Sequence, residues 1–199
     1  MTLDLLDWRR ATAELYRQAR SGARDDPAAA LERFRAGRDR MFAEHPESPL
    51  STEARASFRG LAHWPYDPAL RFDVEVEPAP PERLAATSLG GDAFPLERIG
   101  RVSLPVGVLD VYWIDTYGGG VFLPFRDGTS GTDTYGAGRY LLDTVKGADL
   151  GGERGRLVID FNYAYHPSCA YDARWSCPLA PRANWLTARV EAGERLHAG

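Results

Sequence analysis

The sequence is almost without lysine: of its 24 basic residues, only Lys146 is one. This imbalance, together with abundant alanine and glycine, is typical of codon usage in a G+C-rich genome and indicates no arginine-specific mechanism. Its physical consequence is that cations lining a cleft are guanidinium groups, which grip a carboxylate or a phosphate with two donors. Both signs of charge are interspersed and the net charge is −4, so we expect no nucleic-acid partner and no anionic membrane surface.

Long apolar segments are also missing. No run approaches the roughly 18 apolar residues that a membrane span requires. The first ten residues, MTLDLLDWRR, carry acids among the apolar positions and lack the basic start and apolar stretch of a secretory signal. We therefore expect a cytoplasmic protein, in which the cysteines are reduced by default.

Cysteine and histidine are scarce, with two and four residues respectively. Cys169 and Cys177 are separated by seven residues, which is not the spacing of structural zinc ligands, and the histidines show no ligand spacing among themselves. Three interpretations remain open: two buried unreactive thiols, a disulfide that closes the short loop, and, least favoured, a mononuclear metal site. A nucleophilic cysteine would need His166 as its base and ranks low. We predict no metal ligand.

Several cofactor and catalytic motifs are absent. The run TYGAGRYL (134–141) lacks the lysine and the helix start of a phosphate-binding loop. The chain has no Gly-x-Ser-x-Gly elbow, and the glycines at 118–120 lack the preceding histidine of esterases. We therefore expect no cofactor and no serine hydrolase chemistry.

The first 60 residues carry the spacing of helices. Apolar residues at steps of three and four predict a helix over 3–20, and Asp26 followed by Pro27 predicts the start of a second that runs to about Glu44. That second helix places Arg38 on the same face as Leu31, Phe34 and Met41. A short third helix follows, with Ser51 or Thr52 as its cap.

From Tyr66 the pattern changes to the alternation of strands. No helical stretch between residues 70 and 193 is long enough to serve as a parallel crossover, so we expect antiparallel pairing. We predict one α+β domain over 1–199, in which a helical segment (1–60) packs on a strongly curved, barrel-like antiparallel sheet (66–193). The predicted strands cover 70–78, 83–89, 97–105, 106–116, 120–127, 138–145, 156–165 and 184–193.

Three stretches, TDTYGAGRYL (132–141), DFNYAYHPSCAYDARWSCPL (160–179) and NWL (184–186), are long and unusual. In them the chain resembles the bacterial and archaeal domain-of-unknown-function family 1684, and the likeness extends over nearly the whole chain. The resemblance implies a single-domain, non-secreted protein and brings no activity with it. Such proteins usually have Asn-Pro where this chain has His166-Pro167, which argues against any mechanism that requires His166.

Two strands offer a polar site. In VIDFNYAY the alternation places Asp160 and Asn162 on one face, and in TYGAGRYL Arg139 leaves its strand after two glycines. A bidentate Arg139–Asp160 pair across strands would fix the geometry of the site and keep the carboxylate ionised. The same pair is also a common structural device, so both roles remain open.

The loop 126–136 is rich in hydroxyls and acids and is longer than a minimal hairpin turn, as loops that cover sites often are. The leading hypothesis is a pocket inside the barrel that binds a small polar or anionic molecule. Its ligand-binding residues would be Arg126, Tyr135, Arg139, Asp160, Asn162 and Tyr163.

Two alternatives use other properties of the chain. The first is a cofactor-independent hydrolase or isomerase, with Asp160 as general acid or base and with Arg139 and Asn162 stabilising negative charge. The second is a scaffold that docks another protein through exposed aromatic residues such as Trp8 or Trp64.

Overall fold

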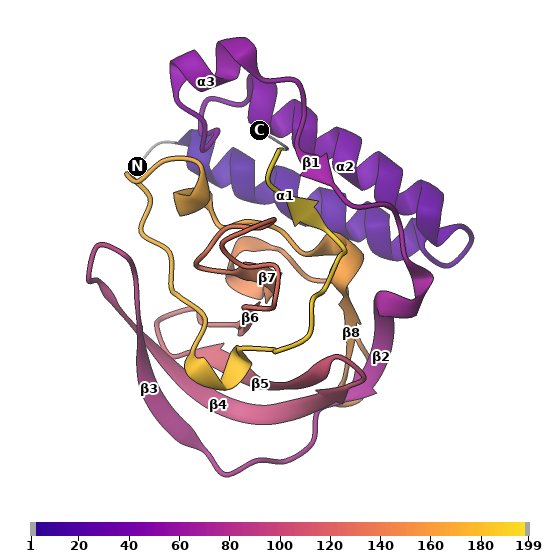
Figure 1. Cartoon of the computed structure of the whole chain (residues 1–199), viewed down its shortest axis with the longest axis vertical. Coiled ribbons are helices and arrows are strands. Elements are labelled where there is room, and N and C mark those ends of the chain that lie inside the picture. The colour runs from indigo at the N-terminus through magenta and orange to yellow at the C-terminus, as the bar shows by residue number, and fades with distance from the viewer. Residues whose placement is uncertain (1–2, 198–199) are drawn as a thin grey trace.

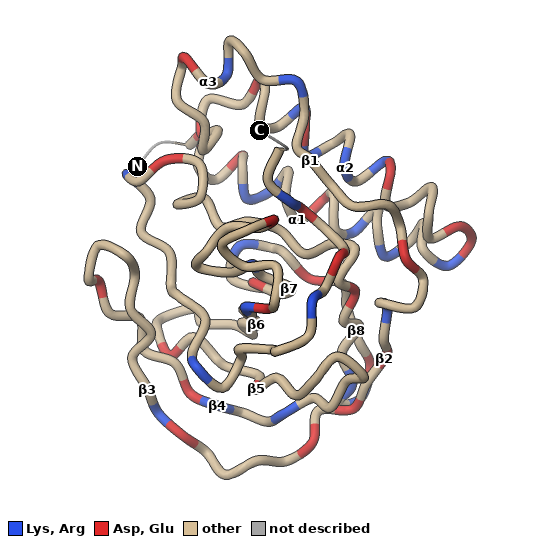
Figure 2. The backbone as a smooth tube through the Cα atoms, viewed as in Figure 1, with Lys and Arg blue, Asp and Glu red and all other residues tan. Residues whose placement is uncertain are grey.

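In the computed structural model, residues 3–197 are described, and three helices cover one side of a curved antiparallel sheet (Figure 1). Basic and acidic residues alternate along the helices and the strands without a block of one sign (Figure 2). The helices fall within the predicted N-terminal segment. Their bounds are α1 Leu3–Gly22, α2 Pro27–Glu44 and α3 Thr52–Ser57.

Local capping explains where two of the helices begin. The Asp26 side chain accepts from the backbone N–H of Ala29 at 3.0 Å, ahead of Pro27 at the first helical position of α2. The Ser51 hydroxyl accepts from Ala54 N in the same way at the start of α3. Both caps confirm the predicted starts.

The strands form three antiparallel sheets. The largest has the order β3-β4-β5-β6-β7, and the others are the pairs β2-β8 and β1-β9. Antiparallel pairing is therefore confirmed. The bounds are β1 Ala62–His63, β2 Arg71–Glu75, β3 Glu82–Thr87, β4 Ala93–Leu104, β5 Gly107–Ile114, β6 Val121–Phe125, β7 Arg139–Asp143, β8 Arg156–Asp160 and β9 Glu194–Arg195.

The expected barrel is not confirmed, because no sheet closes on itself among residues 3–197. Beyond β6, β7 makes only two isolated bridges in the described residues, Tyr140 with Tyr165 (2.9 and 3.1 Å) and Asp143 with Ala148 (2.9 and 3.0 Å). The next strand, β8, pairs with β2 in a separate sheet. The large sheet consequently ends at β3 on one side and at β7 on the other.

The core has three apolar clusters. The largest joins the inner faces of β4 to β8 to the C-terminal segment, through residues such as Leu109, Phe125 and Phe161. The second packs α1 and α2 onto the sheet side of the molecule, and the third lies under β3 and β5 around Tyr140. These clusters fix the positions of the polar residues that sequence analysis singled out.

Two predicted strands differ from the structure. The strand expected over 156–165 ends at Asp160, where the chain enters a 3-10 turn over Phe161–Tyr163. The strand expected over 184–193 is wrong: β9 begins only at Glu194, and the segment itself has an isolated bridge, from Trp185 to Arg126. Its first half bonds to the backbone of Arg126 and Gly128, and Val190 N donates to the Asp127 side chain at 2.7 Å.

Three 3-10 turns surround the C-terminal motifs, at Phe161–Tyr163, Ser168–Ala170 and Arg182–Asn184. Two more lie at Pro68–Leu70 and Thr144–Lys146. Within the stretch from residue 3 to residue 197, none of the helices combines the length and the apolar character of a membrane span.

Candidate functional site

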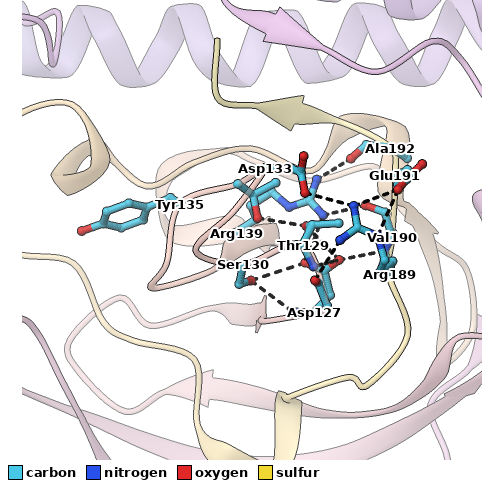
Figure 3. A network of polar contacts seen from close by, with 12 residues as sticks. Asp127, Thr129, Ser130, Asp133, Tyr135, Arg139, Arg189, Val190, Glu191 and Ala192 are labelled. Carbon is cyan, nitrogen blue, oxygen red and sulfur yellow. Dashed lines mark hydrogen bonds and ion pairs between the residues drawn. The ribbon is translucent and has the colours of Figure 1, made fainter. Parts of the chain in front are cut away.

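Arg139 lies in a sealed polar network. Its two terminal nitrogens donate to backbone carbonyls of Val190 (2.9 Å), Ala192 and Glu194 (3.1 Å), and one of them pairs with the Asp127 carboxylate at 3.3 Å. Figure 3 shows these partners converging on the guanidinium from the C-terminal segment. The residue is only 1% exposed, so its charge serves to anchor the chain.

Asp127 organises the loop 126–136 around this network. Its carboxylate accepts from the Thr129 hydroxyl at 2.9 Å and from Val190 N at 2.7 Å. The Thr129 hydroxyl in turn contacts that of Thr134 at 3.0 Å. The buried side chains of Asp127, Thr129 and Thr134 therefore fold the loop on itself, and Gly131 and Thr132 at its centre are exposed.

The predicted Arg139–Asp160 pair is wrong. Arg139 begins β7, which pairs with β6 in the large sheet, whereas Asp160 ends β8, which pairs with β2. The ion pair of Asp160 is with Arg71, at 3.8 Å from Nε to Oδ2. The alternation of each strand gave the correct polar positions, but it does not determine which strands are neighbours.

Asn162 is fully engaged in local structure. Its Nδ2 donates to the carbonyl of Asp67 and to Asp160 Oδ1, both at 2.8 Å, and its Oδ1 accepts from Asp67 N at 2.9 Å. Its backbone N–H also donates to Asp160 Oδ1, at 2.9 Å. Asn162 therefore ties the turn after β8 to the turn before β2 and holds the Asp160 carboxylate in one orientation.

Asp160 is buried and faces a cleft. Burial raises the pKa of its carboxyl group, against the lowering effects of the Asn162 hydrogen bonds and of Arg71. The cleft has a volume of about 570 Å³ and lies between the end of α1, strands β2 and β8, and the loop 150–153. We call it the Asp160 cleft. Its charged lining consists of Arg20, Arg24, Arg71, Arg156, Asp73, Glu153 and Asp160.

Tyr163 contributes a phenol to the same cleft. Its ring packs against Phe34 with centroids 4.9 Å apart, and its residue is 3% exposed. The hydroxyl is buried and has no hydrogen-bond partner within residues 3–197. Buried hydroxyls are normally hydrogen-bonded, so this one lacks its usual partner.

Arg126 and Tyr135 lie at a different cleft, of about 630 Å³, which we call the Trp185 cleft. Tyr135 points away from the Arg139 network (Figure 3), and its backbone N–H donates to His166 Nε2 at 3.3 Å. The Arg126 guanidinium stacks on the Trp185 ring at 4.0 Å. The six predicted ligand-binding residues are thus not brought together: Arg139 lies in a sealed network, the others except Asn162 line two separate clefts, and Asn162 ties two turns together.

Sequence reasoning missed a buried carboxylate at Glu194. It accepts from Arg38 Nε (2.9 Å), from His166 N (2.7 Å) and from the Tyr171 hydroxyl (2.9 Å). Burial favours its neutral form, but Arg38 and the nearby histidines hold the pKa of Glu194 below its usual value. The signal that would have found this group is Arg38 itself, because an arginine on the apolar face of a helix requires a buried acceptor.

The two cysteines are free thiols, one buried and one partly buried, in the cluster under β3 and β5. The Tyr135 hydroxyl lies 3.8 Å from Cys169 Sγ. Within residues 3–197, no three His, Cys, Asp or Glu side chains are grouped so as to hold a metal ion.

Trp8 and Trp64, the aromatic residues of the scaffold hypothesis, pack against other side chains of the protein. Trp8 contacts Phe42 and His45, with centroid distances of 6.0 and 5.2 Å. The Arg139 guanidinium lies 5.3 Å from the Trp64 ring.

Comparison with known proteins connects this architecture to a family. A sequence model described as "Protein of unknown function (DUF1684)" matches residues 56–195. The chain belongs to the DUF1684 family. The solution NMR structure of an uncharacterized protein of Haloarcula marismortui, 34% identical, covers 84% of this chain and 93% of its own with a TM-score of 0.57. No curated protein matches the chain.

Proposed function

We propose that this DUF1684 protein binds a small polar anion in the Asp160 cleft. The observation that carries the proposal is the Tyr163 side chain, which lines the cleft while its buried hydroxyl has no partner in residues 3–197. A ligand hydroxyl or oxyanion would satisfy it. The cleft volume of about 570 Å³ lies in the range of small-molecule sites, roughly 300–1,000 Å³.

The arginines of the cleft favour an anion. Arg24, in the turn after α1, has no side-chain hydrogen bond or ion pair with any described residue. The ion pair of Arg71 is the long contact to Asp160. The lining carries four arginines against three acids, an excess of one positive charge (4 − 3 = +1). A guanidinium that no protein carboxylate neutralises is suited to a ligand carboxylate or phosphate.

The proposed site is therefore a cleft on the helix side of β2 and β8, and not the interior of a barrel as expected from the sequence. Asp160 and Tyr163 keep the ligand-binding role expected from the sequence, and Arg24 and Arg71 take the role assigned to Arg139. Cytoplasmic metabolites that combine hydroxyls with a phosphate or carboxylate have the required chemistry, in keeping with the cytoplasmic location expected from the sequence.

Glycerol 3-phosphate and glycerol are a matched pair of probes for thermal-shift and calorimetric titration. We expect saturable stabilisation by the phosphate ester alone, because the arginines supply the attraction. Tyr163→Phe removes only the unpartnered oxygen, so its unfolding temperature should be unchanged or higher while affinity falls about tenfold, or ~1.4 kcal/mol.

Arg24→Gln should weaken phosphate binding similarly, and Arg17→Gln, on α1 and outside the cleft, serves as the control. If Tyr163→Phe destabilises the protein and leaves binding intact, the hydroxyl is structural and the proposal fails.

A second candidate function is a cofactor-independent hydrolase or isomerase at the same cleft. The favouring observation is the raised pKa of the Asp160 carboxyl group, which brings it closer to the range useful for proton transfer. Asp160→Asn should abolish turnover of a phosphorylated sugar while leaving its binding intact. Binding without turnover in the unaltered protein would leave only the ligand-binding function.

A further inference from the structure

The Trp185 cleft combines an apolar wall with a free sheet edge. Strand β3 forms one side, and the segment 179–185 forms the other. The apolar part of the lining includes Leu84, Ala86, Leu179 and Pro181. The volume of about 630 Å³ exceeds that of the Asp160 cleft, and the two clefts share no lining residue.

Strand β3 is the edge of the five-stranded sheet, and β4 is its strand partner there. The carbonyl of Pro95 accepts from Asp115 N at 2.9 Å, on the β5 side of β4. Pro95 is paired with Ala85 in the register of β3 and β4. Because the carbonyl of Pro95 points to β5, Pro95 and Ala85 form a non-hydrogen-bonded pair. The N–H and C=O of Ala85 therefore point away from β4, toward the free edge of the sheet.

The alternation along the strand places the backbone groups of Arg83 and Thr87 on the same free edge. One of them is already used: the carbonyl of Thr87 accepts from Leu179 N at 2.9 Å. An extended segment of this chain therefore pairs with the edge at its far end. For the N–H and C=O of Ala85 and Arg83, no partner occurs on that edge among residues 3–197.

Two unpaired guanidinium groups lie at the same cleft. Arg126 and Arg182 stack on the ring of Trp185 at 4.0 and 4.2 Å, and the indole N–H is fixed by the Ala180 carbonyl at 3.1 Å. Neither guanidinium has a carboxylate partner in the described part of the chain. The acid in the lining, Glu82, is paired with Arg98 at 2.9 Å.

We infer that the Trp185 cleft binds an extended peptide that pairs with the Ala85 edge and presents its free terminal carboxylate to Arg126 and Arg182. Addition of a strand to a sheet edge supplies backbone hydrogen bonds, and the apolar wall accepts alternate side chains. The two guanidiniums complement a carboxylate charge, which an amidated terminus lacks. This site is independent of the anion site proposed at Asp160.

Fluorescence polarisation with the labelled peptide Ala-Val-Thr-Val tests the inference. We expect the free-acid peptide to bind at least tenfold more tightly than the same peptide with an amidated terminus. Arg182→Gln should reduce the affinity of the free acid to that of the amide and leave the amide unaffected.

Ala85→Pro tests the strand pairing separately. It removes an N–H that the sheet does not use, so the fold is retained, and proline is tolerated at such edge positions. We expect at least a tenfold loss of affinity for both peptides, whereas the control Ala85→Ser, which keeps the N–H, should bind normally.

Three results would overturn the inference: no saturable binding of the free acid, equal binding by Ala85→Pro, or competition by hexanoate as strong as by unlabelled peptide. A dimer in light scattering that Ala85→Pro dissociates would also overturn it, since a second copy of the chain would then occupy the edge.

Discussion

The arginines of this protein occupy two kinds of surroundings. Arg139 and Arg38 are buried and directed by fixed partners, the backbone carbonyls and Asp127 for the first and Glu194 for the second. Three other arginines, Arg24, Arg126 and Arg182, line clefts and have no carboxylate partner among the described residues. The number of fixed partners, and not the residue type or the strand pattern, separates an arginine that stabilises the fold from one available to a ligand.

The largest expected effect on this comparison comes from Arg139→Met. Removal of one member of a buried pair leaves Asp127 and three carbonyls without their donor, so the free energy of unfolding should fall by ~3–5 kcal/mol in urea titrations. Arg24→Met is the control and should leave the unfolding midpoint nearly unchanged. Similar losses in the two variants would erase the distinction between the two kinds of arginine.

A smaller effect is expected from acid. Burial lowers the pKa of His63 and of His166 to about 4, so the unfolded chain binds more protons than the folded one from pH 6.5 down to about 4. Stability should therefore decrease as the pH is lowered through this window, by ~1–3 kcal/mol for each histidine. The Glu194 carboxylate, whose pKa is lowered in the folded protein, loses its contribution to stability below about pH 4.5. Asp160, whose pKa is raised, acts in the opposite direction and favours the folded state as the pH falls.

His166→Asn isolates one part of this acid response. Asparagine does not titrate, so the variant should show a flatter profile between pH 6.5 and 4 when denaturant midpoints are measured across the range. An unchanged slope would mean that the protonation of His166, beside Glu194, does not contribute to the loss of stability in acid.

The smallest effect is expected from Arg17→Gln. The Arg17–Glu14 contact on α1, at 2.6 Å, is closer than the Arg139–Asp127 pair at 3.3 Å, but its side chains are 61% and 47% exposed. Water and salt screen such a pair, so no measurable change in the urea midpoint should follow. A clear loss of stability would show that distance matters more than burial.

The predictable parts of the fold are those with local causes. Asp26 with Pro27 and Ser51 determine helix starts through bonds to residues a few positions away, and the alternation in β2 follows from one face meeting the core. The resemblance to DUF1684 was equally readable, because its motifs are contiguous stretches of sequence.

The parts that sequence reasoning missed have non-local causes. The segment 184–193 alternates like a strand, but its backbone bonds to the backbone of residues 126–128 and to the side chains of Asp127 and Arg139, all more than 50 positions away in the chain. Asp160 and Arg139 each have an ion-pair partner, but the partners are Arg71 and Asp127 and not each other. Local pattern determines the face of a strand, whereas the partner depends on how the sheets divide.

The attachment of Val190, Ala192 and Glu194 to Arg139 joins β7 to a segment more than 50 positions later in the chain. Contacts between such distant residues require the loop between them to close first, which costs conformational entropy. We therefore expect the network around Arg139 to form after the local helices when the protein folds.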